Sequence, residues 1–236
     1  MVLRLDEREE LFKYDLHVHS KEVSPCGKMT IDEIVESYKK SGYEGIWLTN
    51  HLHREFMERT EGMLWEEKIN YFLEPYHRAS RWNKEMFVGL GAEIRFYNDP
   101  NDYLLYGLTE EILYKDGEEW LYLGLKEFFR RYKNRLIIIQ AHPNRSDSSS
   151  PADYRLIHGY EAINSSPRHE NGNSKTQELL CMYPWLIPTA GSDSHRIGDV
   201  GRSGIITDKR LTGNTDLARL LIERRYRLIP FVENNL

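Results

Sequence analysis

Two histidines stand one residue apart in the stretch DLHVHS, where they are His17 and His19. They end the run FKYDLHVH, whose apolar and aromatic residues are typical of a β-strand. Residues i and i+2 of a strand point to the same side, so both imidazoles, and Asp15 with them, are expected on one face. Paired imidazoles can hold a zinc, iron or manganese ion. Such a pair alone is equally compatible with ordinary strand histidines, so the rest of the sequence has to decide.

Further polar residues fall where other predicted strands end. GIWLTNH ends at His51, MFVGLGAEIRF carries Glu93 near its end, and RLIIIQAH ends at His142. WLIPTAGSDSH runs into Asp193 and His195, which have the same two-residue offset as the first pair. Active sites of parallel α/β folds are built at the carboxyl ends of strands. One edge is therefore expected to collect more metal ligands than one ion needs: His17, His19, His51, Glu93, His142, Asp193 and His195.

The elements that must position these residues alternate between strand and helix. In MTIDEIVESYKKSGY, Thr30 is a cap, Glu33 follows three residues later, and Gly42 is placed to end the helix. Further helices are expected over residues 63–83 (interrupted by Pro75), 118–134, 173–183 and 217–226, and further strands over 102–108, 159–164, 204–207 and 227–232. This alternation predicts a parallel sheet, as a barrel or an open sheet, in a single domain spanning residues 1–236.

Composition narrows the class of protein. A chain of 236 residues with 40% hydrophobic residues can bury a sizeable core, and α/β barrels reach this size as single domains. The formal net charge of −5 argues against a protein that grips nucleic acid through its overall field, so no extended nucleic-acid surface is expected.

Two cysteines, Cys26 and Cys181, make no disulfide framework, and the first residues carry acids where a secretory signal would be apolar. No apolar segment approaches the ~20 residues of a membrane helix. The sequence therefore predicts a cytoplasmic protein without a membrane partner.

Taken in order, DLHVHS, LTNH, GAEI, QAHP and GSDSH resemble the motifs of the polymerase and histidinol phosphatase (PHP) superfamily, from about residue 13 to about residue 206. The resemblance implies a distorted (β/α)7 TIM-like barrel whose di- or trinuclear metal centre hydrolyses phosphoesters. The ligand sets that it implies are His17, His19, Glu93 and Asp193 for a first ion, Glu93 and His142 for a second, and His51 and His195 for a third.

The chain departs from the family pattern at three points. Asn50 replaces the usual aspartate of the second motif, and we interpret it as an outer partner of His51 rather than a ligand. No histidine follows GAEI, so Asp102 is the candidate substitute at the second site. The loop KEVSPCGK lacks the histidine of trinuclear members, which leaves the third ion open. Cys26 lies in that loop, where a ligand of the third ion would be sought, but it is interpreted as a buried or idle thiol, and His53 as a loop residue.

These residues predict a phosphoesterase acting on a small phosphomonoester or a nucleotide-type phosphoester. The hypothesis is that a water held between two or three divalent ions (zinc, manganese or iron) loses a proton near neutral pH and attacks phosphorus as hydroxide. Arg145, Arg202 and Arg168 are candidates to anchor the phosphate, because an arginine fork matches phosphate geometry.

Two alternatives stay open. A metal amidohydrolase acting on a C–N bond also has HxH on its first strand and an aspartate late in the chain. It often bridges its metals with a carbamylated lysine, whereas Glu93 stands at the strand end here. The other alternative is a non-catalytic PHP-like binding module with a vestigial site, against which the near-complete ligand set argues.

Overall fold

Continuous apolar runs in the sequence become strands that are buried on both faces. β2 (Gly45–Leu48), β6 (Tyr103–Tyr106), β7 (Ile137–Gln140) and β8 (Gly159–Asn164) are buried at every position. Runs of this kind belong to sheets that are covered on both sides. The structure, a computed structural model, describes residues 10–83, 85–146 and 149–229, so the last part of the strand expected over 227–232 lies outside the described residues.

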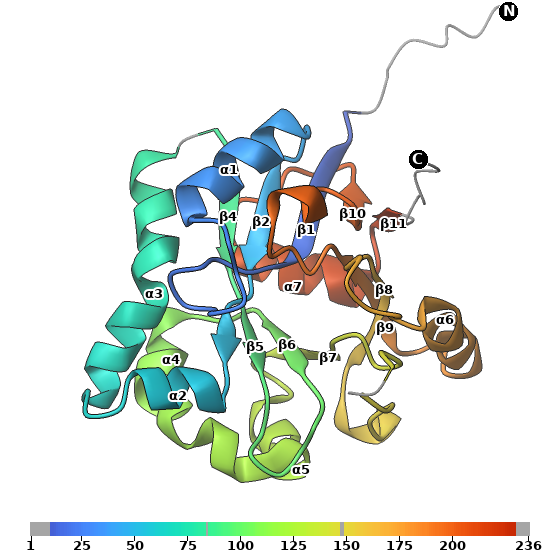
Figure 1. Ribbon diagram of the computed structural model, residues 1–236. Helices are drawn as coiled ribbons and strands as arrows, with labels where there is room; N and C mark the ends of the chain where they lie inside the picture. The colour runs from blue at the N-terminus through green and yellow to red at the C-terminus, as the bar shows by residue number, and fades with distance from the viewer. Residues whose placement is uncertain (1–9, 84, 147–148, 230–236) are drawn as a thin grey trace, which may run out of the picture.

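The strands of the described residues form two sheets. The first has the order β11-β10-β1-β2-β4, and the second has the order β3-β5-β6-β7-β8-β9. The remaining strand bounds are β1 (Phe12–Val18), β3 (His51–Leu52), β4 (Phe87–Leu90), β5 (Ala92–Ile94), β9 (Ile187–Gly191), β10 (Gly204–Thr207) and β11 (Arg227–Ile229). The sheets meet where β1 lies against β9, with a parallel bridge between Val18 and Ser194. Together they form a distorted TIM-like barrel (Figure 1).

The expectation of a purely parallel sheet is wrong. β6 runs antiparallel to both β5 and β7, and β10 runs antiparallel to both β1 and β11. β5 connects to β6 through residues 95–102 without a helix, and a connection that short does not return the chain to the start of a parallel strand. The sequence shows this break, since DYLLYGL follows GAEI with no helical run between them.

Two runs that were expected to be single strands are each divided between the sheets. GIWLTNH becomes β2 and β3, and MFVGLGAEIRF becomes β4 and β5. At the second division, a Cβ on Gly91 would lie 3.0 Å from Thr49 Cγ2 and 3.1 Å from the carbonyl oxygen of Leu105, so glycine allows the close passage. The division places β3 beside β5 in parallel, with His51 opposite Glu93.

Helices cover the sheets on the outside, with α1 and α3 beside the first sheet and α4 and α5 below the second in the view of Figure 1. Their bounds are α1 (Ile31–Lys40), α2 (Arg54–Arg59), α3 (Trp65–Trp82), α4 (Glu110–Asp116), α5 (Trp120–Tyr132), α6 (Asn173–Met182) and α7 (Asn214–Glu223), with 3₁₀ turns η1 (Gly117–Glu119), η2 (Tyr154–Leu156) and η3 (Ile197–Asp199). No helix in the described ranges is long and apolar enough to cross a membrane.

The helix signals in the sequence were partly right. Thr30 caps α1 and forms a capping box with Glu33, and Gly42 follows the helix end at a φ of 70°. Pro75 does not interrupt α3, which continues through it while burying Phe72 and Leu73 on the same face. A proline removes one backbone hydrogen bond, and burial of the apolar face outweighs that loss. The short helices α2 and α4 were not expected.

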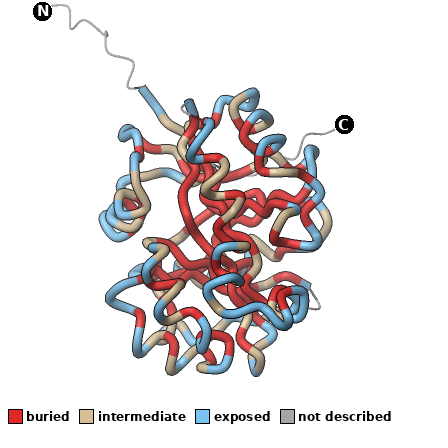
Figure 2. The backbone as a smooth tube through the Cα atoms, turned by 90° about the vertical axis from the view of Figure 1, so that its left-hand side faces the viewer, coloured by how far each residue is buried: buried red, intermediate tan, exposed pale blue. Residues whose placement is uncertain are grey.

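Buried residues run through the middle of the molecule, and exposed residues lie at its rim (Figure 2). Most buried side chains are apolar, but a group of polar ones is buried at the ends of β1, β3, β5, β7 and β9. Buried polar groups are retained where they have partners or ligands, so this end of the barrel is where a site is expected.

Candidate metal centre

The carboxylate of Glu93 lies at the centre of the buried polar group. Its Oε1 is 3.5 Å from His17 Nε2 and 3.2 Å from His142 Nε2. Its Oε2 is 3.4 Å from His19 Nε2 and 2.9 Å from His51 Nε2. A carboxylate that faces imidazoles with both oxygens is suited to bridge two metal ions.

The carboxylate of Asp193 also lies close to His17 and His19. Its Oδ1 is 3.6 Å from His17 Nε2, 3.4 Å from His19 Nε2 and 3.3 Å from His195 Nδ1. β1 supplies His17, and the loop after β9 supplies both Asp193 and His195. The contact of β1 with β9 therefore brings the first and the last of the five sequence motifs together.

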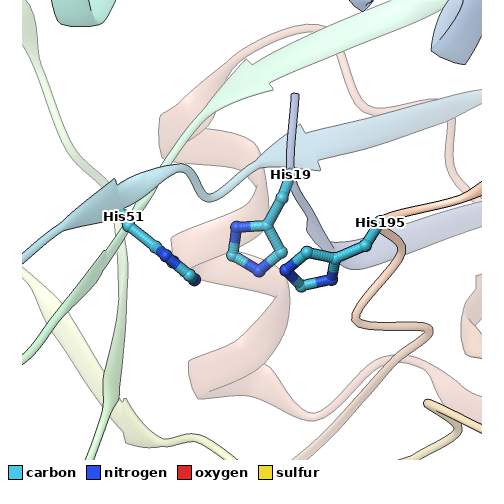
Figure 3. A group of neighbouring side chains, drawn as sticks. All are labelled: His19, His51 and His195. Carbon is cyan, nitrogen blue, oxygen red and sulfur yellow. The ribbon is translucent and has the colours of Figure 1, made fainter. Parts of the chain in front are cut away.

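Four groups of side chains in the described part of the chain have potential ligand atoms within 4.8 Å of one another. They are His19, His51 and His195; His17, His19 and Asp193; His51, His53 and Glu93; and Glu93, Asp102 and His142. These groups contain every ligand predicted from the sequence, the possible ligand Asp102 included, and also His53. Figure 3 shows the first group, in which His51 and His195 lie on either side of His19.

Buried histidine nitrogen atoms show that these side chains are suited to bind metal ions. Nε2 of His17, His19 and His53 is buried, with no hydrogen-bond partner among the residues that the structure describes. Leaving a buried polar atom unpaired costs about 1–3 kcal/mol, so three such atoms at one place fit the binding of metal ions. For His17 the orientation is set by Glu161, whose Oε1 lies 2.8 Å from Nδ1 and leaves Nε2 facing Glu93 and Asp193.

The electrostatics of the site favour positive charge in its middle. Burial lowers the pKa of His17, but Glu161, Asp193 and Glu93 outweigh it and hold that pKa well above its ordinary value. Burial lowers the pKa of His19 well below its ordinary value, which keeps this imidazole neutral, as a metal ligand must be. The carboxylates therefore attract a cation, either a proton or a metal ion.

Two of the candidate ligands have a strained backbone. His142 has a φ of 30° and Asp193 a φ of 49°, and Arg224 is the one other non-glycine residue with positive φ among those that the structure describes. Such conformations are unfavourable for residues with a Cβ and concentrate at functional sites. Both are the second residue after a strand, β7 or β9, where the turn aims the side chain at the cluster.

Comparison with known proteins identifies this architecture. No family model matches the chain, and no curated protein matches its sequence. A two-domain protein from Bacteroides vulgatus, which contains a predicted PHP-like metal-dependent phosphoesterase, is 17% identical, with a TM-score of 0.66 over 93% of this chain. A putative metal-dependent phosphoesterase from Bifidobacterium adolescentis is 15% identical, with a TM-score of 0.53 over 90% of this chain and 96% of its own. The chain has the PHP fold.

The PHP resemblance that the five motifs indicated is thus confirmed at the level of fold, over nearly the whole chain. A lesion-specific endonuclease from Pyrococcus furiosus shares the fold at 13% identity, with a TM-score of 0.66 over 93% of this chain. The chain spans 65% of the length of the Bacteroides protein and 58% of that of the endonuclease, so both neighbours carry parts that it does not match.

The cluster of candidate ligands opens into a cavity of about 230 Å³. Its lining is Cys26, His51, Glu93, Arg95, Asp102, His142, Arg145, Arg168, His169, Asp193, His195 and Arg196. Of the three arginines predicted to bind phosphate, Arg145 and Arg168 line this cavity, and Arg202 does not. The backbone N–H of Arg202 instead donates to Ser192 Oγ at 3.0 Å.

Arg145 and Arg168 are both held in place by the site itself. Arg145 forms an ion pair with the carboxylate of Asp193, and its Nε donates to Asn171 Oδ1 at 3.0 Å. Arg168 pairs with Asp199 at 3.1 Å and donates to the carbonyl oxygen of Asp193 at 3.2 Å. A guanidinium fixed in this way needs little further ordering to bind an anion.

Asp102 reaches the second site, but with a partner that the sequence did not indicate. Its carboxylate is 3.7 Å from His142 Nε2 and accepts two hydrogen bonds from Arg95, at 2.8 and 2.7 Å. His53 Nε2 lies 3.3 Å from the same carboxylate, and the His53 ring stacks on His51 with centroids 4.3 Å apart. The sequence carried a signal for His53, since HLH repeats the spacing of HVH.

Other residues fall outside the cluster or support it. His77 lies on α3 beside Glu110, and His158 contacts the backbone of β7. Asn50 accepts hydrogen bonds from the N–H of Ser20 at 2.8 Å and the hydroxyl of Ser24 at 3.0 Å, so its observed contacts tie down the loop after β1.

Proposed function

We propose that this protein is a metal-dependent phosphoesterase that hydrolyses a small phosphomonoester or a nucleotide-type phosphoester. The observation that supports it most is that the buried ligand groups around Glu93 open into the same cavity that Arg145 and Arg168 line. Guanidinium groups beside a cluster of metal ligands are suited to bind a phosphate whose other oxygens face the metals.

The metal ions, zinc, manganese or iron, would be held as the sequence predicts. The ligand sets are His17, His19, Glu93 and Asp193 for the first ion, Glu93, His142 and Asp102 for the second, and His51 and His195 for a third. Bound ions of this kind lower the pKa of coordinated water and offset negative charge on phosphoryl oxygens.

Side chains around the metal ligands would position the substrate and the ligands themselves. Arg145 and Arg168 would bind and orient the phosphoryl oxygens, and their own hydrogen bonds fix them before substrate arrives. Glu161 holds the His17 ring in the orientation that aims Nε2 at the cluster. The cavity volume of about 230 Å³ suits a phosphate with part of its leaving group, which favours a small substrate.

The amidohydrolase alternative is less well supported, because Glu93 holds the central position and no lysine is among the residues lining the cavity. A cytoplasmic location stays a prediction from the cysteine content.

The test measures bound metal in protein purified without chelator, together with turnover of an aryl phosphate in zinc, manganese or iron. Wild-type protein should contain two or more ions, and His17→Ala and Asp193→Asn should lose both metal and turnover. His77→Ala, on the surface of α3, is the matched control and should behave as wild type. Absence of bound metal together with absence of turnover in every ion would refute the proposal.

A further inference from the structure

The loop after β1 brings a thiol to the metal-ligand cluster. Cys26 Sγ lies 3.0 Å from His195 Nε2 and 3.7 Å from His51 Nδ1. These two histidines come from the loop after β9 and from β3, so three segments far apart in the sequence converge on the sulfur. The sequence indicated an idle thiol here, and the structure instead places it against two candidate ligands of the third ion.

The loop is anchored on both sides of Cys26. Before it, Ser24 Oγ donates to Asn50 Oδ1 at 3.0 Å and accepts the backbone N–H of His51, also at 3.0 Å. After it, the N–H of Lys28 donates to the carbonyl oxygen of His195 at 2.8 Å. The loop is therefore tied to the backbones of the same two histidines whose rings face the thiol, and this fixes the sulfur between them.

A second feature at this point is the buried ring of His19. His19 is fully buried between the two rings, with centroids 4.5 Å from His51 and 4.4 Å from His195, and its Nε2 has no hydrogen-bond partner (Figure 3). Potential ligand atoms of the three histidines lie within 4.8 Å of one another. The unpaired Nε2 of His19 also faces Glu93 and Asp193, which the first ion would share, so the converging imidazoles of His51 and His195 are left for a further cation.

We propose that Cys26 is a thiolate ligand of the ion held by His51 and His195, and so takes the place of the histidine that is missing from its loop. The inference rests on the proposed metal centre and adds the identity of its third site. On binding, the thiol proton leaves to solvent and the sulfur donates an electron pair to the metal. A thiolate with two imidazoles favours zinc over manganese, whereas carboxylate-rich sites accept both, so the third site selects its metal differently from the other two.

Cobalt(II) reports this directly, because thiolate–cobalt coordination gives a near-ultraviolet charge-transfer band that nitrogen and oxygen ligands do not give. Wild-type protein loaded with Co²⁺ should show the band, and Cys26→Ser should lose it together with about one bound ion per chain. Cys26→His should keep the ion without the band. Cys181→Ser changes the other free cysteine, on α6, and should keep both.

The outcomes separate this inference from the proposed function. Cobalt bound by the wild type without a charge-transfer band, or a band that survives in Cys26→Ser, would overturn the role of Cys26 and leave the metal centre standing. Failure of the wild type to bind any cobalt would overturn the metal centre, and the inference with it.

Discussion

Glu161 accepts a hydrogen bond from His17 Nδ1 at 2.8 Å through one carboxylate oxygen and one from the backbone N–H of His142 at 2.9 Å through the other. A single buried side chain on β8 thus contacts candidate ligands of two of the proposed ions. The sequence left Glu161 unassigned, although it is a charged residue in the middle of the otherwise uncharged strand GYEAIN.

Replacing Glu161 by glutamine should weaken metal binding about 10–100-fold, because partners that orient metal-bound imidazoles have effects of this size. Glutamine keeps the volume but loses the charge and one acceptor. Competition with a chelator measures the affinity, and Glu178→Gln, at an exposed position of α6, is the matched control. Unchanged affinity in Glu161→Gln would show that the contact is only structural.

Arg145 and Arg202 provide a contrast between a cavity arginine and one outside it. Arg145→Met should reduce kcat/KM for an aryl phosphate about 10–100-fold, since one charge-assisted hydrogen bond contributes about 1.5–3 kcal/mol. The kcat/KM of Arg202→Met should stay within about 3-fold of the wild-type value, because Arg202 does not line the cavity. Metal content is measured alongside, because Arg145 also contacts Asp193. Equal losses in both variants would contradict the placement of the phosphate.

Gly191 ends β9 directly against His17. A Cβ at this position would lie 2.4 Å from His17 Cβ and 3.0 Å from Glu161 Oε1. Gly191→Ala should therefore destabilise the fold by about 1–3 kcal/mol, as overpacking does, and lower metal affinity by displacing the ring. Urea unfolding measures the first effect. Gly213→Ala is the control, because its Cβ would meet nothing closer than 3.8 Å.

His158 predicts a pH dependence of stability that is independent of the metal centre. Burial lowers its pKa below the ordinary value, and Nδ1 accepts the N–H of Ile138 at 3.0 Å, which requires the neutral ring. At high pH the ring is neutral in both states. As the pH falls through about 6.5 the unfolded chain takes up a proton that the folded chain resists, so stability falls.

In His158→Gln this contribution is absent, and the free energy of unfolding should decline less between about pH 7 and about pH 5 than in the wild type. Urea titrations at several pH values measure the slope for both proteins. The same slope in both would mean that His158 is protonated equally easily in the folded and unfolded chains.

The sequence by itself determined the types of the candidate ligands, their order and the ends of the strands that carry them. That was possible because HxH and SDSH encode a side-chain direction through the two-residue period of a strand, and because apolar runs mark buried strands. The cap of α1 was equally local, since Thr30 and Glu33 interact within one turn.

Only the tertiary structure decided which of the candidate ligands lie side by side. Glu93 meets His51 because one apolar run divides at Gly91 and the next sheet begins there, and no local period records such a division. The roles proposed for Cys26 and Glu161 depend on contacts with residues more than a hundred positions away in the sequence. Cys26 contacts His195, and Glu161 contacts His17. Arg202 looked equivalent to Arg145 in sequence, and it was excluded from the cavity because the direction of a loop side chain is set by packing rather than by spacing.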